Sequence, residues 1–239
     1  MPPASDPLRM YLVLRRGAIE ELSRAGELAG AAAVACVRRY SDDPAFAEAF
    51  EEWRPRPGKV CLRARTASQW QQVRAEPHAE AGDPEGESAV ALPPRRRSER
   101  GPLLERLQAM SSDLRAAPAC AAESDSRAAL TYVLNPAAVM SSGKTVAQVA
   151  HAAVLAADGG RVQDWVAAGC PGRVLAPSEE VFAEVAARPD CVARVVDAGI
   201  TEVPPGTVTV VALAPGPAGA LPASLWGESQ SGPDCGLSP

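Results

Sequence analysis

The chain has 239 residues, enough for one large domain or two small ones with real cores. Hydrophobic residues make up 46% and charged residues 22%, as in ordinary globular proteins, and no apolar run reaches the ~18 residues of a membrane span. A net charge of −5 excludes a general attraction to nucleic acid, so any RNA-binding surface must be local.

The six cysteines are spread along the chain without a C-x-x-C pair or a neighbouring histidine. This spacing predicts reduced, buried thiols rather than a disulfide framework or a metal site. Residues 1–10 lack the charged start and the apolar stretch of a signal peptide. We therefore expect a cytoplasmic protein without a bound metal and without a membrane contact.

The first predicted unit spans residues 9–94 and begins with a buried strand over 10–15, a short apolar run with a tyrosine and a valine. An alanine-rich helix follows from Gly26. The later landmarks are Trp53, a Gly-Lys-Val step at 58–60 and a closing strand that begins at Ser88.

A linker is predicted over residues 95–128. Its apolar residues at helical spacing indicate an amphipathic helix: Leu103, Leu104, Leu107 and Met110. Its arginines form either a solvated charged surface or a set of phosphate contacts: Arg95, Arg96, Arg97, Arg100 and Arg106.

The second predicted unit spans residues 129–217, and in it strands alternate with helices. The expected elements are a strand over 131–135, helices over 144–157 and 161–168, a strand over 172–176, a helix over 178–187, and strands over 191–197 and 207–213. Residues 218–239 are rich in Pro, Gly and Ser and are predicted to be a disordered tail.

The two units share landmarks in the same order. GELAGAAAVACV from Gly26 aligns without a gap with GKTVAQVAHAAV from Gly143, and Trp53 with its following glycine matches Trp165 with Gly172. The closing strands SAVALPP and TVVALAP are also similar. We interpret the units as two copies of one α/β fold; the alternative is coincidence in an alanine-rich chain.

The helix that opens at Gly143 carries a polar stripe on an otherwise apolar rod. Ser142 is expected to cap it, and Lys144, Gln148 and His151 follow at positions i, i+4 and i+7 on one face. A lysine in the first turn opposes the helix dipole unless an anion is bound there. The stripe therefore predicts a phosphate site at Gly143 and Lys144. The corresponding residues of the first unit are Glu27, Ala31 and Val34.

A rival interpretation is a nucleotide-binding phosphate loop. Residues 138–145, AVMSSGKT, fit its relaxed pattern if Ala138 replaces the first glycine. Hydrolysis of a nucleotide also needs an acidic strand end to hold Mg²⁺, for which Asp197 is the weak candidate. We therefore rank a nucleotide-binding protein as the less favoured function.

Two separated motifs point elsewhere. VMSSGKTVAQVAHAAVLAA, from Val139, and DAGITEVPPGTVTVVALAPGP, from Asp197, resemble the first helix and the closing segment of the type II peptidyl-tRNA hydrolases. The resemblance implies a three-layer α/β/α fold around a small mixed four-stranded sheet in each unit. It also implies hydrolysis, without a cofactor, of the ester that joins a peptide to tRNA, so tRNA is the expected partner.

The resemblance implies roles for residues of the second unit. Lys144, Asp197 and His151 are the catalytic candidates, with Lys144 also facing phosphates and Asp197 acting as acid–base or orienting group. The substrate-binding candidates are Gln148, Thr201, Thr207 and Thr209.

Several positions depart from the family pattern. Basic or acidic residues are replaced by Asn135, Ala137, Val139 and Ser142; Ile200 and Glu202 stand in the AGxTQ turn, and Ala212 and Ala214 replace glycines of the last strand. These changes keep open the alternative of an inactive member that binds tRNA or a protein.

The first unit lacks the polar stripe and is expected to be structural. Because the resembling family works as a dimer of single units, we predict that the two units pack as a pseudo-dimer within one monomeric chain.

Overall fold

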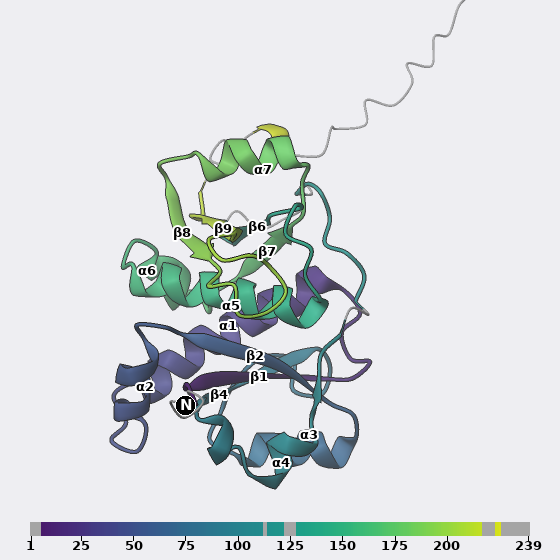
Figure 1. Cartoon of the computed structure of the whole chain (residues 1–239), viewed down its shortest axis with the longest axis vertical. Helices are drawn as coiled ribbons and strands as arrows, with labels where there is room; N and C mark the ends of the chain where they lie inside the picture. Colours follow the sequence, from purple (N-terminus) through teal and green to yellow (C-terminus); the bar gives the residue numbers. More distant parts are fainter. Residues whose placement is uncertain (1–5, 112–113, 122–127, 217–222, 226–239) are drawn as a thin grey trace, which may run out of the picture.

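The structure is a computed structural model that describes residues 6–111, 114–121, 128–216 and 223–225. It contains two separate mixed sheets with helices packed on them, which confirms the expected α/β class with two tandem units (Figure 1). The first unit fills the lower half of this view and the second unit the upper half. None of the described helices combines the length and the apolarity that a membrane crossing requires.

The elements of the first unit are β1 (Arg9–Arg15), α1 (Leu22–Tyr40), α2 (Ala47–Trp53), β2 (Gly58–Ala64), α3 (Ala67–Ala75), β3 (Ala79–Gly82), β4 (Ser88–Arg95), α4 (Gly101–Arg106) and β5 (Gln108–Ala109). β1 lies in the middle of the sheet, parallel to β2 and antiparallel to β4. The strand order is β3-β4-β1-β2-β5.

The elements of the second unit are β6 (Leu130–Leu134), α5 (Ser142–Asp158), α6 (Gln163–Ala167), β7 (Gly172–Leu175), α7 (Glu179–Ala186), β8 (Cys191–Val196) and β9 (Val208–Leu213). Each begins and ends within two residues of its expected position. β6 is parallel to β7 and antiparallel to β9, and the strand order is β7-β6-β9-β8.

The two sheets have the same topology. Read from the opposite edge, the second order is β8-β9-β6-β7, which corresponds strand by strand to β3-β4-β1-β2. The helices between them also correspond, α1 to α5, α2 to α6 and α3 to α7. The first sheet has five strands instead of the expected four, because linker residues Gln108 and Ala109 pair with the free edge of β2.

The two tryptophans that the sequence aligns make the same contact. Trp53 Nε1 donates to the carbonyl of Gly58 at 2.8 Å, and Trp165 Nε1 donates to the carbonyl of Pro171 at 2.7 Å. The counterpart of Gly58 is therefore Pro171 and not Gly172, which corrects the predicted alignment by one residue. In a strand such a shift exchanges the two faces of the sheet.

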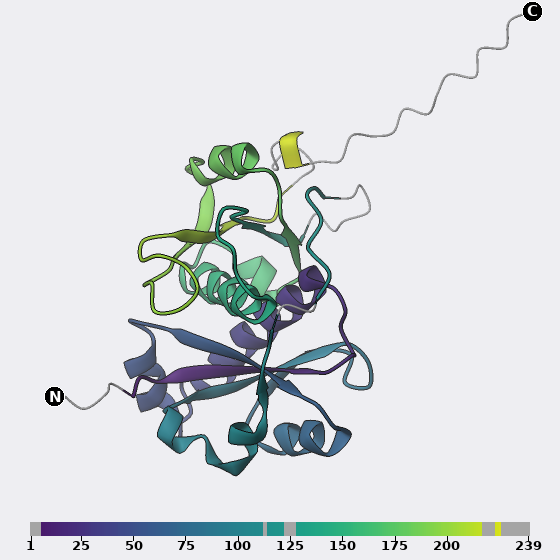
Figure 2. The same ribbon diagram turned by 45° about the vertical axis from the view of Figure 1, so that its right-hand side comes forward.

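Helices α1 and α5 form a shared layer between the two sheets (Figures 1 and 2). α1 packs on β3, β4 and β7, and α5 packs on β2, β8 and β9, so each helix contacts both sheets. Small residues allow this close approach: a Cβ atom at Gly30 would lie 3.3 Å from the Cβ of Ala153. One continuous apolar cluster consequently spans both units.

The outer faces of the sheets have cores of their own. Trp70 and Val73 of α3, with Leu104 of α4, cover the first sheet. Phe182 and Val185 of α7 cover the second. The molecule is thus layered as helices, sheet, shared helices, sheet and helix, as Figure 1 shows from bottom to top.

The linker helix is shorter than expected. α4 ends at Arg106, and the chain continues in extended form through β5 to Met110 because the edge of β2 offers backbone partners. Leu107 packs on the outer core, whereas Met110 packs in the central cluster.

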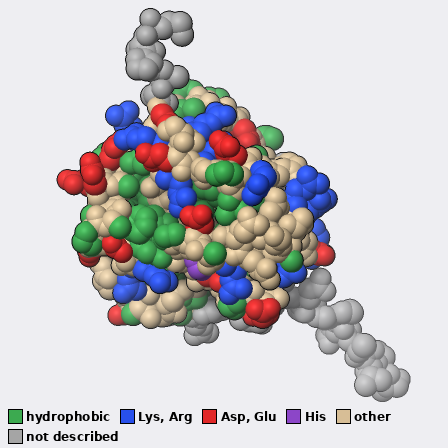
Figure 3. All heavy atoms as spheres, turned by 90° about the horizontal axis from the view of Figure 1, so that it is seen from below, with side chains coloured by type: hydrophobic (Ala, Val, Ile, Leu, Met, Phe, Trp, Pro, Cys, Tyr) green, Lys and Arg blue, Asp and Glu red, His purple; other side chains and the backbone are tan. Residues whose placement is uncertain are grey.

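Two arginines of the basic run have carboxylate partners. Arg95 pairs with Glu76 at 3.3 Å, and Arg96 pairs with Glu52 at 2.6 Å. On the molecular face seen from below in Figure 1, basic and acidic side chains lie intermingled (Figure 3). These contacts favour the solvated charged surface over a phosphate site for this run.

The predicted disordered tail, 218–239, lies outside the described residues apart from Ala223–Leu225. These three residues form a 3₁₀ turn in which Leu225 is fully buried in the outer core of the second unit. Of the described cysteines, Cys36 and Cys61 are buried free thiols, and burial raises the pKa of each to about 12.

Candidate active site

The first turn of α5 is capped one residue earlier than expected. The hydroxyl of Ser141 accepts a hydrogen bond from the backbone N–H of Lys144 at 3.2 Å, whereas Ser142 is already helical. Ser142 instead faces the linker, and its hydroxyl accepts from the N–H of Leu114 at 3.5 Å. The cap holds the first turn, and with it Lys144, in place.

Two polar side chains of α5 meet the carboxylate at the end of β8. Lys144 Nζ and Gln148 Nε2 each donate to Asp197 Oδ2 at 2.5 Å. Lys144 Nζ also donates to Thr201 Oγ1 at 2.9 Å. The structure thus brings together four of the predicted site residues, which we call the Lys144–Asp197 cluster: Lys144, Gln148, Asp197 and Thr201.

Asp197 begins the loop over 197–206, and backbone hydrogen bonds join the two ends of this loop. Its N–H donates to the carbonyl of Thr207 at 2.9 Å, and its carbonyl accepts from the N–H of Gly206 at 2.8 Å. Gly199, with φ of +73°, donates its N–H to Asp197 Oδ1 at 2.8 Å. A Cβ atom at Gly199 would lie only 2.5 Å from the nitrogen of Pro205, so glycine is required there.

The surroundings of Asp197 keep it ionised. Burial by itself raises the pKa of this carboxyl, which is 7% exposed, but the hydrogen bonds from Lys144, Gly199 and Gln148 outweigh it and lower the pKa below 3.8. Of the roughly four lone-pair sites of a carboxylate, these three donors use all but one. The remaining site, on Oδ1, can accept from water or a hydroxyl.

The N-terminal end of α5 already holds an anion from the protein itself. The carboxylate of Glu202 accepts from the N–H of Ser141 at 2.6 Å and from its hydroxyl at 2.8 Å. On another side, a Cβ atom at Gly143 would lie 2.5 Å from the carbonyl oxygen of Met110. Glu202 and the linker thus lie beside the predicted phosphate site at Gly143 and Lys144, which stays a prediction.

The same contacts weaken the phosphate-loop alternative, because a nucleotide would have to displace both groups. Neither contact has a local sequence signal. In the sequence, Glu202 differs only in being an acid where the family pattern has glutamine, and Met110 is one apolar residue of the expected linker helix.

His151 lies one turn beyond Gln148 and forms no hydrogen bond with any described residue. Its burial first, and then the positive charge of Lys59 on β2, lower its pKa to about 3. The imidazole is therefore neutral at neutral pH. The charges of Asp197 and Lys144 also act on its pKa, so His151 lies near the cluster, and its catalytic role stays a prediction.

The other two threonines stabilise the backbone around the cluster. The Thr207 hydroxyl donates to the carbonyl of Pro204 at 2.8 Å within the loop. Thr209 is fully buried in β9, and its hydroxyl donates to the carbonyl of Val195 at 3.4 Å. Thr209 thus lines no surface, contrary to its expected contact with substrate.

The departures from the family pattern have structural partners as well. Asn135 Nδ2 donates to the carbonyl of Val208 at 2.7 Å, which ties the end of β6 to β9. In the first unit, Glu27 pairs with Arg24 at 3.5 Å, and Val34 is 1% exposed in the central cluster. Val34 therefore belongs to the packing between units, whereas Glu27 pairs within α1.

No group of three or more His, Cys, Asp or Glu side chains gathers within the described ranges in a way that could hold a metal ion. The groups that meet at the cluster are an ammonium, a carboxylate, an amide and a hydroxyl. They can bind an oxyanion, donate hydrogen bonds to a carbonyl and orient a water molecule.

The model of the family described as peptidyl-tRNA hydrolase PTH2 matches residues 129–223. A curated peptidyl-tRNA hydrolase from Staphylothermus marinus is 42% identical over 89 residues, which cover 33% of this chain and 74% of that protein. No solved structure matches the chain significantly. The family match contains the whole Lys144–Asp197 cluster.

Proposed function

Because the chain belongs to the peptidyl-tRNA hydrolase PTH2 family through residues 129–223, we propose that it hydrolyses the ester between a peptide and the 3′ ribose of tRNA. It would be a carboxylic ester hydrolase of translation that acts in the cytoplasm without a cofactor. The observation that carries the proposal is the convergence of Lys144 and Gln148 on Asp197.

The hydrogen-bond donors of the cluster can stabilise the negative charge that develops on the carbonyl oxygen during ester hydrolysis. Lys144 has three N–H donors, of which Asp197 and Thr201 accept two, so the third can bind the carbonyl oxygen of the ester as it becomes an oxyanion. Asp197 fixes the ammonium in this position. We assign Lys144 the role of oxyanion stabiliser.

The free lone pair of Asp197 Oδ1 is assigned to the attacking water. The water oxygen bonds to the ester carbon while its proton is directed to this carboxylate; the bond to the ribose oxygen then breaks, and that oxygen takes a proton. A carboxylate with a lowered pKa is a weak base, so orientation of the water is its larger contribution.

Three exposed apolar side chains suit contact with the peptide; two of them adjoin cluster residues in the sequence, and Val139 stands two residues before the cap Ser141. Val139 is 84% exposed and precedes the cap, Val196 is 54% exposed beside Asp197, and Ile200 is 78% exposed beside Thr201. We assign them to the peptide portion of the substrate.

The test is release of peptide from peptidyl-tRNA by the full chain and by Lys144→Ala and Gln148→Ala. Loss of an oxyanion donor typically lowers the rate about 10²–10³-fold, so Lys144→Ala should fall in this range, with Gln148→Ala at least about tenfold slower. Gln163→Ala, an exposed glutamine on α6, is the matched control and should retain the wild-type rate.

Full activity in both site variants would contradict the assignment. The alternative is an inactive member that binds tRNA without cleaving it. It is favoured by Glu202, which accepts from the N–H of the cap residue Ser141, and by the absence of basic residues that the family pattern has in this unit. It predicts salt-sensitive tRNA binding by the wild type with no release of peptide.

A further inference from the structure

The loop over 197–206 is held on the first turn of α5 by polar contacts. Within this loop only Asp197 and Val203 are buried, and the remaining residues are exposed or half-buried. Backbone hydrogen bonds join the two ends of the loop to each other, but they do not connect its middle to α5. Side-chain contacts with α5 therefore decide where the middle of the loop lies.

Glu202 makes two such contacts, both with the cap residue Ser141. Its Oε2 accepts from the backbone N–H of Ser141 at 2.6 Å, and its Oε1 accepts from the hydroxyl at 2.8 Å. Hydrogen bonds to a carboxylate are stronger than bonds between neutral groups. Because both oxygens bind the same residue, the pair of contacts fixes the orientation of the carboxylate as well as its distance.

The carboxylate also sets the direction of the cap hydrogen bond. An ionised carboxylate only accepts, so the hydroxyl of Ser141 donates its proton to Glu202. The lone pairs of the hydroxyl oxygen are then left to accept, and one of them accepts from the N–H of Lys144 at 3.2 Å. Glu202 thereby orients the hydroxyl that caps the turn carrying Lys144.

The neighbour of Glu202 in the loop binds the ammonium itself. Thr201 Oγ1 accepts from Lys144 Nζ at 2.9 Å, and Asp197 Oδ2 accepts from the same nitrogen at 2.5 Å. The ammonium is thus held at the start of the loop and again in its middle. Because Glu202 fixes the middle of the loop to Ser141, it acts on the position of Thr201 and, through Thr201, on Lys144.

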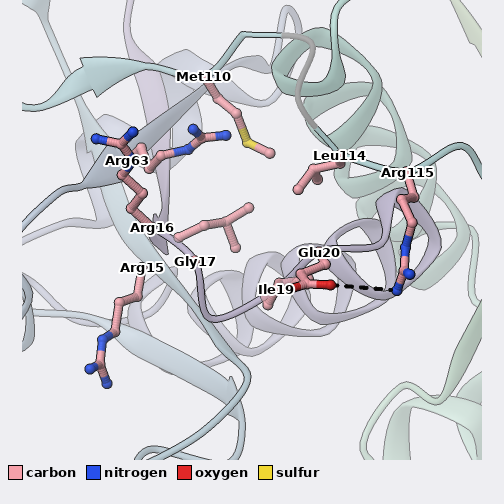
Figure 4. Close-up of a pocket in the computed structure, with 10 residues that line it drawn as sticks. Arg15, Arg16, Gly17, Ile19, Glu20, Arg63, Met110, Leu114 and Arg115 are labelled. Atoms are coloured by element: carbon pink, nitrogen blue, oxygen red, sulfur yellow. Dashed lines mark ion pairs between the residues drawn. The ribbon is translucent and has the colours of Figure 1, made fainter.

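The linker holds another side of the same turn. The N–H of Leu114 donates to the hydroxyl of Ser142 at 3.5 Å, and the carbonyl oxygen of Met110 would lie 2.5 Å from a Cβ atom at Gly143. The side chains of Met110 and Leu114 line a cavity between the end of β1 and the start of α1 (Figure 4). Both also pack on the central cluster. The linker thus joins the turn to the first unit, and Glu202 joins the loop to the turn.

We propose that Glu202 is a positioning residue for ester hydrolysis: its carboxylate ties the loop to the Ser141 cap and so holds Thr201 and Lys144 where the third N–H of the ammonium reaches the ester. The inference rests on the proposed function. The glutamine of the family pattern can make two similar contacts, because its amide oxygen accepts and its amide nitrogen donates. Obstruction of the site by Glu202, by contrast, predicts a faster reaction when the side chain is removed.

The first test measures kcat and KM for peptidyl-tRNA in variants of the full chain. Glu202→Gln retains both contacts without the charge and should keep kcat within about threefold of the wild type. Glu202→Asp retains the charge, but its carboxylate is one methylene too short for both contacts. Glu202→Asp and Glu202→Ala should therefore lower kcat about 10–10²-fold, with KM changed less than about threefold.

The matched control is Glu180→Ala, which removes an exposed glutamate from the first turn of α7, on the outer face of the second sheet. It should react at the wild-type rate. Thermal unfolding verifies that each variant folds. Should Glu202→Ala fail to fold, Glu202→Gln and Glu202→Asp supply the same comparison.

The second test needs no substrate, because the chain has only two lysines, Lys59 and Lys144. The full chain is treated with limiting acetic anhydride, and mass spectrometry measures the rate of acetylation at each lysine. Glu202→Ala and Glu202→Asp should label Lys144 at least about threefold faster than the wild type, because local opening of the loop releases the ammonium. Lys59, on β2, is the internal reference and should label at the wild-type rate in every variant, as should Lys144 in Glu202→Gln.

Three results would overturn the proposal. A greater loss of kcat in Glu202→Gln than in Glu202→Asp would show that charge and not position matters. A faster reaction in Glu202→Ala would show that the carboxylate obstructs the site. Equal increases in the labelling of Lys59 and Lys144 would show a general loss of stability.

The two tests also separate this inference from the proposed function. If the wild type releases no peptide but Lys144 alone labels faster in Glu202→Ala and Glu202→Asp, Glu202 positions the ammonium and the hydrolase assignment fails. If the wild type hydrolyses peptidyl-tRNA and every Glu202 variant matches it in rate and in labelling, the hydrolase assignment stands and the positioning role is overturned.

Discussion

Replacement of Lys144 by methionine removes the ammonium from the cluster and retains most of the side chain's volume. Asp197, 6% exposed at its side chain, then keeps only the hydrogen bonds from Gln148 and Gly199. A buried carboxylate that loses its counter-charge is expected to destabilise the fold, because its desolvation is no longer offset.

The magnitude follows from the burial of the two partners. Breaking a fully buried pair costs about 3–5 kcal/mol. Here the side chain of Lys144 is 18% exposed and two N–H donors to Asp197 remain, so we expect about 1–3 kcal/mol. The pKa of Asp197 should rise in the variant, because burial is then opposed by fewer hydrogen bonds.

The pH dependence has a definite sign. In the wild type the pKa of Asp197 is lower in the folded chain than its ordinary value of 3.8, so the pair contributes stability above that value. This contribution is lost as the pH falls through the folded pKa. The difference in free energy of unfolding between wild type and Lys144→Met should therefore be largest near pH 7 and shrink below about pH 4.

Urea unfolding at several pH values, in a double-mutant cycle with Asp197→Asn, measures this coupling. We expect a coupling energy of about 1–3 kcal/mol at pH 7 that falls towards zero in acid. A coupling below about 0.5 kcal/mol at pH 7, or one that does not change with pH, would refute the reasoning.

Three further predictions concern the loop, the helix layer and the histidine. Gly199→Ala should abolish most activity, because the added Cβ would lie 2.5 Å from the nitrogen of Pro205. Gly206→Ala, which is also at positive φ but has open space around it, should lose much less activity, and a rate assay compares the two variants. Gly30→Leu should destabilise the fold by about 1–3 kcal/mol or more through overpacking against Ala153. Chemical denaturation compares it with Ala183→Leu, which places the same side chain on the exposed face of α7, and equal losses in the two variants would contradict this. The rate should show no histidine titration between pH 5 and 8, since the pKa of His151 is about 3; an inflection near 6.5 that disappears in His151→Gln would show the assignment to be wrong.

Periodicity was sufficient to predict the elements of the second unit. Alternating strand and helix patterns gave each boundary within two residues, and the i, i+4 spacing placed Lys144 and Gln148 on one face. That these side chains meet Asp197 followed only from the family resemblance. A local sequence pattern does not define the distance between the end of a strand, such as β8, and the start of a helix, such as α5.

The missed features are long-range contacts of residues with weak local signals. Glu202 reaches Ser141 across 61 positions, and the carbonyl of Met110 packs on Gly143 because β5 extends what was expected to be a helix. The burial of Thr209 could have been anticipated, since it stands within the continuous apolar run of a central strand.

The most direct test of the account is a single-turnover assay of peptidyl-tRNA hydrolysis with Asp197→Asn, with tRNA binding measured on the same samples. The amide keeps the shape of the carboxylate but removes the charge that orients Lys144 and the water. We predict that the rate falls by about 10²-fold or more while the affinity for tRNA changes less than about threefold. A wild-type rate in Asp197→Asn, or a loss of tRNA binding that fully accounts for the slower reaction, would contradict a catalytic centre at this cluster.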